Sequence, residues 1–105
     1  MGVSSGRIEI RDLEGSTTHE VGTVGTTPVD LPSSADKAIS ELLINTQAID
    51  SATKTLQISF DGGTNYFTLK RNTLVGWSVK GRLQQIKVKG SAASTNYDIL
   101  INFEK

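Results

Sequence analysis

The chain of 105 residues contains no cysteine, one histidine and one tryptophan, and aromatic residues make up only 6% of it. Without cysteine, neither a disulfide bond nor a thiolate metal site can form, and a single histidine leaves a zinc site unexpected. Small secreted domains usually depend on disulfides, so the absence of cysteine favours a protein that folds inside the cell over a secreted one.

Net charge and long apolar runs are also absent. The 11 basic residues balance the 11 acidic ones, whereas phosphate binding needs a basic excess or a basic stripe. No apolar run approaches the roughly 20 residues that cross a bilayer, and residues 1–6 lack the pattern of a signal peptide. We therefore expect neither a nucleic-acid partner nor a membrane partner.

Residue combinations that could perform catalysis are few and unspecific. A Ser-His-Asp triad would need His19, but the sequence has no Gly-x-Ser-x-Gly turn to expose a nucleophile. The carboxylate pairs Asp12 with Glu14 and Asp30 with Asp36 stand in polar segments, where no burial would separate their pKa values for acid–base work. The sequence thus predicts a protein that is not an enzyme, with no catalytic, cofactor-binding or metal-binding residues.

The segment Asp-Gly-Gly-Thr-Asn at 61–65 allows two interpretations. Asp61 and Asn65 could offer oxygen atoms to a calcium ion, but the segment lacks the acidic density and the closing glutamate of an EF-hand loop. Strand-like runs flank it, so a hairpin is favoured, with Gly62 and Gly63 at positive φ. In that hairpin, Asp61 and Asn65 bond to nearby backbone groups.

Apolar and polar residues alternate through most of the chain, and clusters of Gly, Ser, Thr and Asn separate the alternating runs. Period-two alternation places one face of each run in a core and the other in water, as in antiparallel sheets. We predict an all-β fold, an antiparallel β-sandwich or jelly-roll-like barrel of about seven or eight short strands. The predicted strands are 7–13, 26–31, 39–46, 54–60, 65–70, 74–80, 84–89 and 97–103.

Two segments are patterned less clearly. Apolar residues within 34–49 also fit helical spacing, and a strand over about 39–47, after one helical turn at most, is the interpretation that we favour. Residues 14–38 hold few apolar residues and both prolines, which predicts a long polar loop or an arm that docks on a neighbouring subunit. The expected organisation is an N-terminal arm or first strand over 1–22 and a β-sandwich domain over 23–105.

The aromatic residues could belong to the core or to a binding platform. Trp77 shares a strand face with Val75 and Val79, which favours the core. Alternatively, Trp77 or Tyr66 stacks on a sugar ring in a carbohydrate-binding module.

Basic residues gather in the second half of the chain. They would occupy outward strand positions beside water, or else form a basic face that meets an acidic neighbouring subunit. These residues are Lys70, Arg71, Lys80, Arg82, Lys87 and Lys89.

Four stretches carry a family resemblance in their order along the chain: GTTPVDLP at 25–32, AISELLINT at 38–46, LQISFDGGTNYFTL at 56–69 and IKVKGS at 86–91. Residues 23–103 thereby resemble the small β-sandwich structural proteins of tailed bacteriophages. Asn72-Thr73-Leu74 departs from that pattern, which has a proline-glycine turn there, and residues 1–22 lie outside it.

The resemblance implies a virion protein that is made in the host cytoplasm. The expected role is a capsid decoration or cement subunit or a minor capsid protein, which binds neighbouring subunits through strand edges and its N-terminal arm. The alternatives are a tail or neck component, or the carbohydrate-binding module described above. Expected partners are the major capsid protein or a tail or neck protein, together with further copies of the chain in a homo-oligomer. Hydrophobic residues make up only 36% of the chain, and such a low share agrees with a chain that is stabilised by burial against partners.

Overall fold

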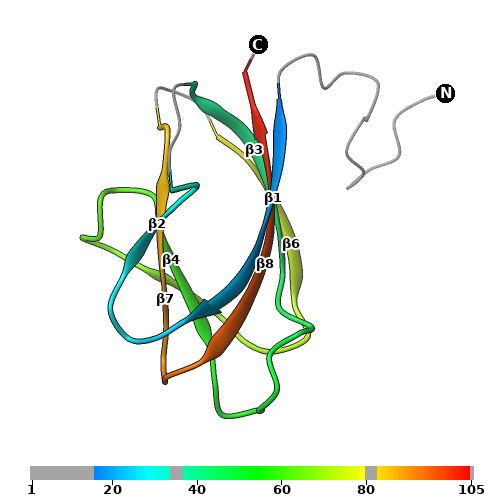
Figure 1. The fold of residues 1–105 in the computed structure, drawn as a ribbon, viewed down its shortest axis with the longest axis vertical. Helices are drawn as coiled ribbons and strands as arrows, with labels where there is room; N and C mark the ends of the chain where they lie inside the picture. The colour runs from blue at the N-terminus through cyan, green and yellow to red at the C-terminus, as the bar shows by residue number, and fades with distance from the viewer. Residues whose placement is uncertain (1–15, 34–36, 80–82, 105) are drawn as a thin grey trace, which may run out of the picture.

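The computed structural model describes residues 16–33, 37–79 and 83–104. Within these ranges the chain forms eight β-strands and no helix. The strands make two four-stranded sheets that face each other as the layers of a sandwich (Figure 1). The predicted all-β antiparallel sandwich is therefore confirmed. No membrane-spanning helix occurs among the described residues.

Each sheet has a strand order that is not the order of the sequence. Sheet A has the order β1-β8-β3-β6 and sheet B the order β2-β7-β4-β5. The strands of sheet A are β1 (Thr17–Val24), β8 (Thr95–Phe103), β3 (Ile39–Asn45) and β6 (Leu74–Ser78). The strands of sheet B are β2 (Val29–Leu31), β7 (Ile86–Gly90), β4 (Leu56–Ser59) and β5 (Phe67–Leu69).

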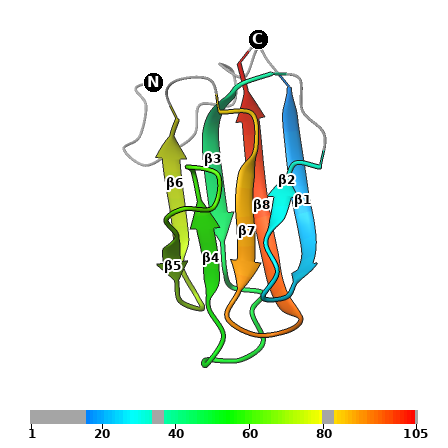
Figure 2. The ribbon, with the colours of Figure 1, turned by 90° about the vertical axis from the view of Figure 1, so that its left-hand side faces the viewer.

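The pairings are those of one long β-hairpin whose two paired arms are folded over into two sheets. β1 pairs with β8, β2 with β7, β3 with β6 and β4 with β5, all antiparallel. Eight strands paired in this way form the double-sheet jelly roll. β5 and β6 are the edge strands at one side of the sandwich, and β2 and β1 are those at the other side (Figure 2). The two open sides of the sandwich are therefore bordered by four edge strands.

Alternate side chains of the inner strands fill the space between the sheets. Leu42 and Ile44 of β3 are buried, as are their neighbours Ile99 and Ile101 on β8. Sheet B contributes inward residues from β4 and β7 in the same way. The apolar core consists of Val24, Leu31, Ile39, Leu42, Ile44, Ile49, Leu56, Ile58, Leu69, Ile86, Val88, Ile99, Ile101 and Phe103.

The strand predictions agree with the structure over most of its described part. β2 to β8 overlap the predicted runs from 26–31 to 97–103, and β3 confirms the strand interpretation of residues 39–47 over the helical one. The predicted strand at 7–13 lies outside the described residues.

The prediction of a long loop or arm over 14–38 is wrong for the described part of that segment. β1, which is not among the predicted strands, lies there, and its residues 17–22 belong to the segment assigned to an arm or first strand. β1 is a polar edge strand, so apolar residues do not alternate clearly along its sequence. It is held by a complete ladder to β8, from Thr17 opposite Asn102 to Val24 opposite Thr95.

Thr46, directly after β3, joins the two sheets. Its buried hydroxyl donates to the carbonyl oxygen of Lys70, 2.6 Å away, and accepts from the Thr73 amide at 2.7 Å. These two residues bracket the turn that leads from β5 in sheet B to β6 in sheet A. Asn72 adopts a φ of 65° in that turn, a conformation that asparagine tolerates better than most residues.

Candidate functional site

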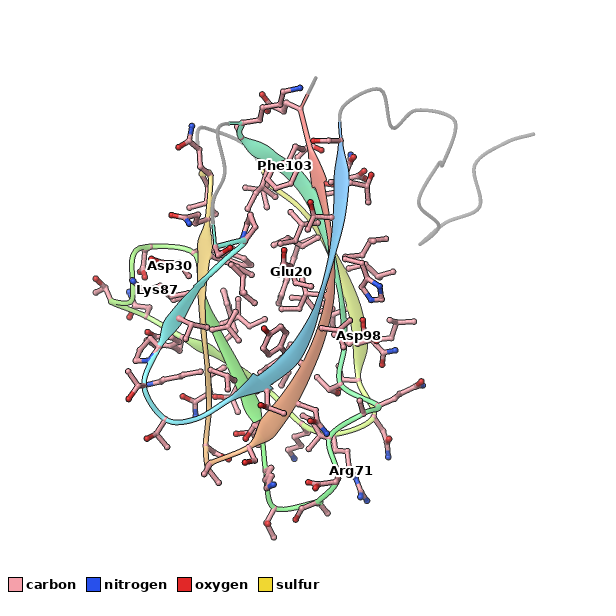
Figure 3. The ribbon with its side chains drawn as sticks, viewed as in Figure 1. Glu20, Asp30, Arg71, Lys87, Asp98 and Phe103 are labelled. Atoms are coloured by element: carbon pink, nitrogen blue, oxygen red, sulfur yellow. The ribbon has the colours of Figure 1, made fainter. Side chains whose placement is uncertain are left out.

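Of the titratable residues considered for catalysis, the structure describes His19 and Asp30, which lie on opposite outer faces of the sandwich. The His19 Nε2 atom lies 2.5 Å from an Asp98 carboxylate oxygen, and the histidine side chain is 57% exposed on the outer face of sheet A. Asp30 forms an ion pair with Lys87, with a distance of 2.8 Å, on the outer face of sheet B. Figure 3 shows Asp98 and the Asp30–Lys87 pair on opposite sides of the sandwich.

The other carboxylates considered, Asp12, Glu14 and Asp36, lie outside the described residues. Within the part of the chain that the structure describes, no three His, Asp or Glu side chains come close enough to hold a metal ion.

The loop at 61–65 uses both carboxylate oxygens of Asp61 to fold itself. One oxygen accepts hydrogen bonds from the Ser59 hydroxyl at 2.7 Å, the Thr64 amide at 3.1 Å and the Asn65 amide at 2.9 Å. The other accepts from the Asn65 side chain at 2.8 Å. Gly62 and Gly63 have φ values of 79° and 98°. The predicted hairpin with positive-φ glycines is confirmed, and Asp61 and Asn65 bond to the loop as expected.

Replacing Asp61 with asparagine is expected to destabilise the protein at pH 7, because the carboxylate would no longer accept the bonds of the loop. The Asn65 amide, Ser59 and the Asn65 side chain, in that order, hold the pKa of Asp61 far below its usual value of 3.8. A lowered pKa stabilises the fold above the unfolded value and loses this effect as the pH falls below it. The difference between the two proteins should therefore shrink on acidification.

Urea unfolding at pH 7 and at about pH 2.5 would measure that difference. Asp50→Asn is a suitable control, because Asp50 is exposed and its side chain pairs, among the described residues, only with Lys54, at 3.1 Å. An Asp61→Asn variant that is as stable as the unmodified protein at pH 7 would contradict the structural role of the loop.

The outer face of sheet B is polar, and its charges are already paired. The hydrogen bond and ion pair with Asp30 raise the pKa of Lys87. The Lys89 ammonium lies 4.2 Å from the centroid of the Tyr66 ring. Tyr66 therefore already has a cation over its ring, where the carbohydrate interpretation would place a sugar. Of the basic residues considered for contact with a neighbour, Lys70 and Arg71 are exposed, and Lys80 and Arg82 lie outside the described residues.

The outer face of sheet A differs, because apolar side chains cross it. Its middle row runs from His19 on β1 through Leu100 and Leu43 to Gly76 on β6. Leu43 and Leu100 are direct cross-strand neighbours, and both are only partly buried.

Two further apolar residues lie one row away, on the two edge strands of sheet A. Val21 on β1 is 63% exposed and Leu74 on β6 is 62% exposed. Polar residues flank them: Val21 lies opposite Asp98, and Leu74 opposite Asn45. We call Val21, Leu43, Leu74 and Leu100 the apolar band.

A second apolar feature opens along the side where β5 and β6 meet. The rings of Phe60, Phe67 and Trp77 pack together there, with centroids 5.2–5.7 Å apart. Phe67 is 53% exposed although it points toward the other sheet. A hollow of about 390 Å³, which we call the edge groove, is lined by Phe60, Phe67, Trp77, Ser78, Val79 and Leu83.

Trp77 packs against the core beside Val75 and Val79, as its strand pattern predicted, and it also borders the edge groove. Sugar binding needs polar groups that contact hydroxyls beside the stacking ring. Among the described lining residues, Ser78 alone has a hydroxyl, and its side chain lies on the outer face of sheet A, opposite Glu41. The groove therefore suits apolar side chains better than a sugar.

Sequence reasoning did not identify the apolar band, although a signal for it exists. Leu42-Leu43-Ile44 and Ile99-Leu100-Ile101 are apolar triplets, and period-two alternation allows only two members of such a triplet on the inner face. The middle leucine of each triplet, Leu43 and Leu100, must then point outward. The exposure of Phe67 follows from the edge position of β5, which strand alternation does not reveal.

The comparisons with known proteins add no relative: no family model, no curated protein and no solved structure matches the chain.

Proposed function

We propose that the chain is a non-enzymatic structural subunit of a tailed-phage virion, a capsid decoration or cement protein or a minor capsid protein. It docks on the shell through the apolar band on the outer face of sheet A. The single observation that carries this proposal is that band, formed by Val21, Leu43, Leu74 and Leu100 on a face that a free-standing sandwich would keep polar.

The band has the arrangement of a protein–protein contact. A typical interface has an apolar centre and a polar, solvent-accessible rim. Here the adjoining row across the sheet is entirely polar, with Thr17, Asn102, Glu41 and Ser78 in register. His19 and Asp98, already paired with each other, border the band near Val21. The rim can therefore contact a partner through hydrogen bonds.

The band is small, so one copy is expected to bind weakly. Fully burying a side chain of this kind contributes about 1.5–3 kcal/mol, and association itself opposes binding by at least about 4 kcal/mol. A repeated shell compensates for this, because many weak contacts hold linked copies firmly. A weak contact per copy therefore suits a protein that coats a repeated lattice better than one that binds a single soluble partner.

The phage assignment has separate support in the resemblance of residues 23–103 to small β-sandwich virion proteins. The jelly-roll pairing of the strands agrees with it, because that architecture is common in viral capsid domains, although a fold alone does not establish a function. A tail or neck protein remains the alternative within this class. Symmetry separates the two, since a decoration subunit repeats over the shell whereas a neck or tail subunit forms a ring.

Replacing Val21 and Leu74 with lysine is expected to weaken shell binding by at least tenfold, because two charges would enter the contact while the interior stays unchanged. Both side chains are more than 60% exposed, so the stability should change by less than about 1 kcal/mol. Binding would be measured by co-sedimentation with shells, and separately with tails, from the phage whose genome encodes the chain.

The matched control places the same two charges on sheet B. Thr64 and Thr68 are both exposed on that side, so Thr64→Lys with Thr68→Lys should leave binding intact. If the unmodified protein bound neither shells nor tails, the virion proposal would be refuted. If the Val21 and Leu74 double variant bound shells as well as the unmodified protein does, the apolar band would not be the docking surface.

A further inference from the structure

We propose that the edge groove is a second interface, which takes residues 7–13 of another copy of the chain. The donated segment adds to the outer edge of β6 as a fifth strand of sheet A. Its Ile8 and Ile10 side chains then enter the groove beside Phe67 and Trp77. This contact joins copies to one another, so it goes beyond the proposed attachment to a shell.

The groove is built to accept such a strand. β6 ends sheet A, and among the described residues it pairs only with β3. Its inward residues Val75 and Trp77 are partly buried, and Phe67 of β5 is 53% exposed across from them. A strand along β6 would satisfy the free backbone groups of that edge and cover these rings.

The donor segment has the matching pattern. In the sequence Arg-Ile-Glu-Ile-Arg at 7–11, both isoleucines fall on one face of a strand and the charged residues on the other. Residues two positions apart on a strand are about 6.6–6.8 Å apart, so Ile8 and Ile10 match the spacing of alternate inward residues on β6. Pairs of aromatic and β-branched side chains across strands are favourable.

The reach of the chain makes this contact intermolecular. β1 and β6 are the opposite edges of sheet A, so a strand beyond β6 would lie about 19 Å from β1 at the usual strand spacing. The segment that links residue 13 to residue 17 spans at most about 14 Å when fully extended. Paired with β6 over its whole length, the segment 7–13 therefore cannot reach the groove of its own chain, whereas it can reach that of a neighbour.

The same segment could instead fold back along β1 of its own chain, but a charged residue on β1 disfavours that placement. Glu20 occupies an inward position of β1 (Figure 3), and an inward charge on an edge strand disfavours the addition of another strand. A strand along β1 would place its isoleucines beside this carboxylate, whose burial is costly. β6 offers Val75 and Trp77 at the corresponding positions instead.

The test uses the full chain and its state of association. Ile8→Asp with Ile10→Asp removes the donor, and Phe67→Asp removes the acceptor. Sedimentation should find assemblies for the unmodified protein and monomers for each variant alone. Mixing the two variants should give a one-to-one dimer, because each retains the half that the other lacks.

A cross-link places the contact, and it needs no background control for native thiols because the chain has none. Ile10→Cys and Phe67→Cys, made in separate chains and mixed, should form a disulfide between chains upon oxidation. Ile10→Cys mixed with Val21→Cys, on the other edge of sheet A, should not.

The outcomes separate this inference from the proposed function. A monomeric unmodified protein at all concentrations, or assemblies that persist in the Ile8→Asp and Ile10→Asp variant, would overturn the donated strand. So would a disulfide to position 21 in place of position 67. The arm variant retains the apolar band, so its single copies should still bind shells, but more weakly than the linked copies of the unmodified protein do.

Discussion

Replacing Thr46 with valine is expected to lower the free energy of unfolding by about 2–3 kcal/mol. Valine has the same shape as threonine but no hydroxyl, so the Thr73 amide and the Lys70 carbonyl would each lose their short bond to Oγ1. A partly buried polar group left without a partner costs about 1–3 kcal/mol. Because a small domain has only about 5–15 kcal/mol in total, the melting temperature should fall by about 10 °C or more.

The position of Thr46 makes this loss larger than that of an average surface hydrogen bond. Its backbone also bonds to the turn between β5 and β6, since its amide donates to the Thr73 carbonyl at 2.8 Å. That turn carries the chain from one sheet to the other, so loosening it affects both layers. Thermal unfolding followed by circular dichroism would measure the change.

Thr68→Val is the matched control, because Thr68 is exposed on β5, two residues before Lys70. Its effect should stay within about 0.5 kcal/mol. Equal stabilities of the two valine variants would show that Thr46 does not join the sheets.

Replacing Gly90 with alanine is expected to destabilise the fold by about 3 kcal/mol, through overpacking. Gly90 ends β7 on the inner face, and Thr95 begins β8 directly against it. A Cβ atom at residue 90 would overlap the Thr95 side chain and come within 3.0 Å of the Ala92 carbonyl oxygen. Thr95 cannot move away freely, because its hydroxyl holds the turn by donating to Ala92 at 2.8 Å.

Gly76→Ala provides the contrast at another strand glycine. A Cβ there would lie 3.7 Å from its nearest neighbours, Leu42 O and Leu43 Cδ1, which is an ordinary contact. Alanine should be neutral or stabilise the protein by about 0.4–1 kcal/mol, because it restricts the unfolded chain. Chemical denaturation of both variants measures the difference, and a Gly90→Ala variant as stable as Gly76→Ala would contradict the described packing of the β7–β8 turn.

Strand alternation predicted the inner strands well because each of them buries one face. The apolar residues of β3, β4, β7 and β8 alternate in the sequence and line the core in the structure. Gly62 and Gly63 likewise predicted their hairpin, since few other residues adopt positive φ. These parts of the fold follow from local sequence because the chemistry that forms them is local.

β1 was missed because its stability comes from another part of the chain. Val24 is its only buried residue, and the remaining positions are polar, small or exposed. At Gly22 the Tyr97 side chain of β8 lies directly over the backbone, 2.8 Å from where a Cβ would stand. The apolar side chains that stabilise this pairing thus belong to β8, some 70 residues later in the sequence. The local sequence pattern of β1 therefore cannot reveal that it forms a strand.

The binding surfaces were predictable only in part. Leu43 and Leu100 carry a sequence signal, as the middle residues of apolar triplets. Val21 and Phe67 carry none, because their exposure depends on which strands end each sheet, and strand order is a property of the whole fold. The absence of a catalytic constellation in the sequence gave no guidance toward either surface.

The pairing of β1 with β8 has a consequence for how the protein is made. β8 lies between β1 and β3, so sheet A stays split until residues 95–103 have been synthesised and have left the ribosome. Before that point the nascent chain exposes β3 with an unpaired side, which favours aggregation, and chains dominated by such distant pairings fold slowly. Synthesis at a reduced temperature, or with a chaperone that shields unpaired strands, should therefore raise the yield of soluble protein more than stabilising the hairpin at 59–67 would.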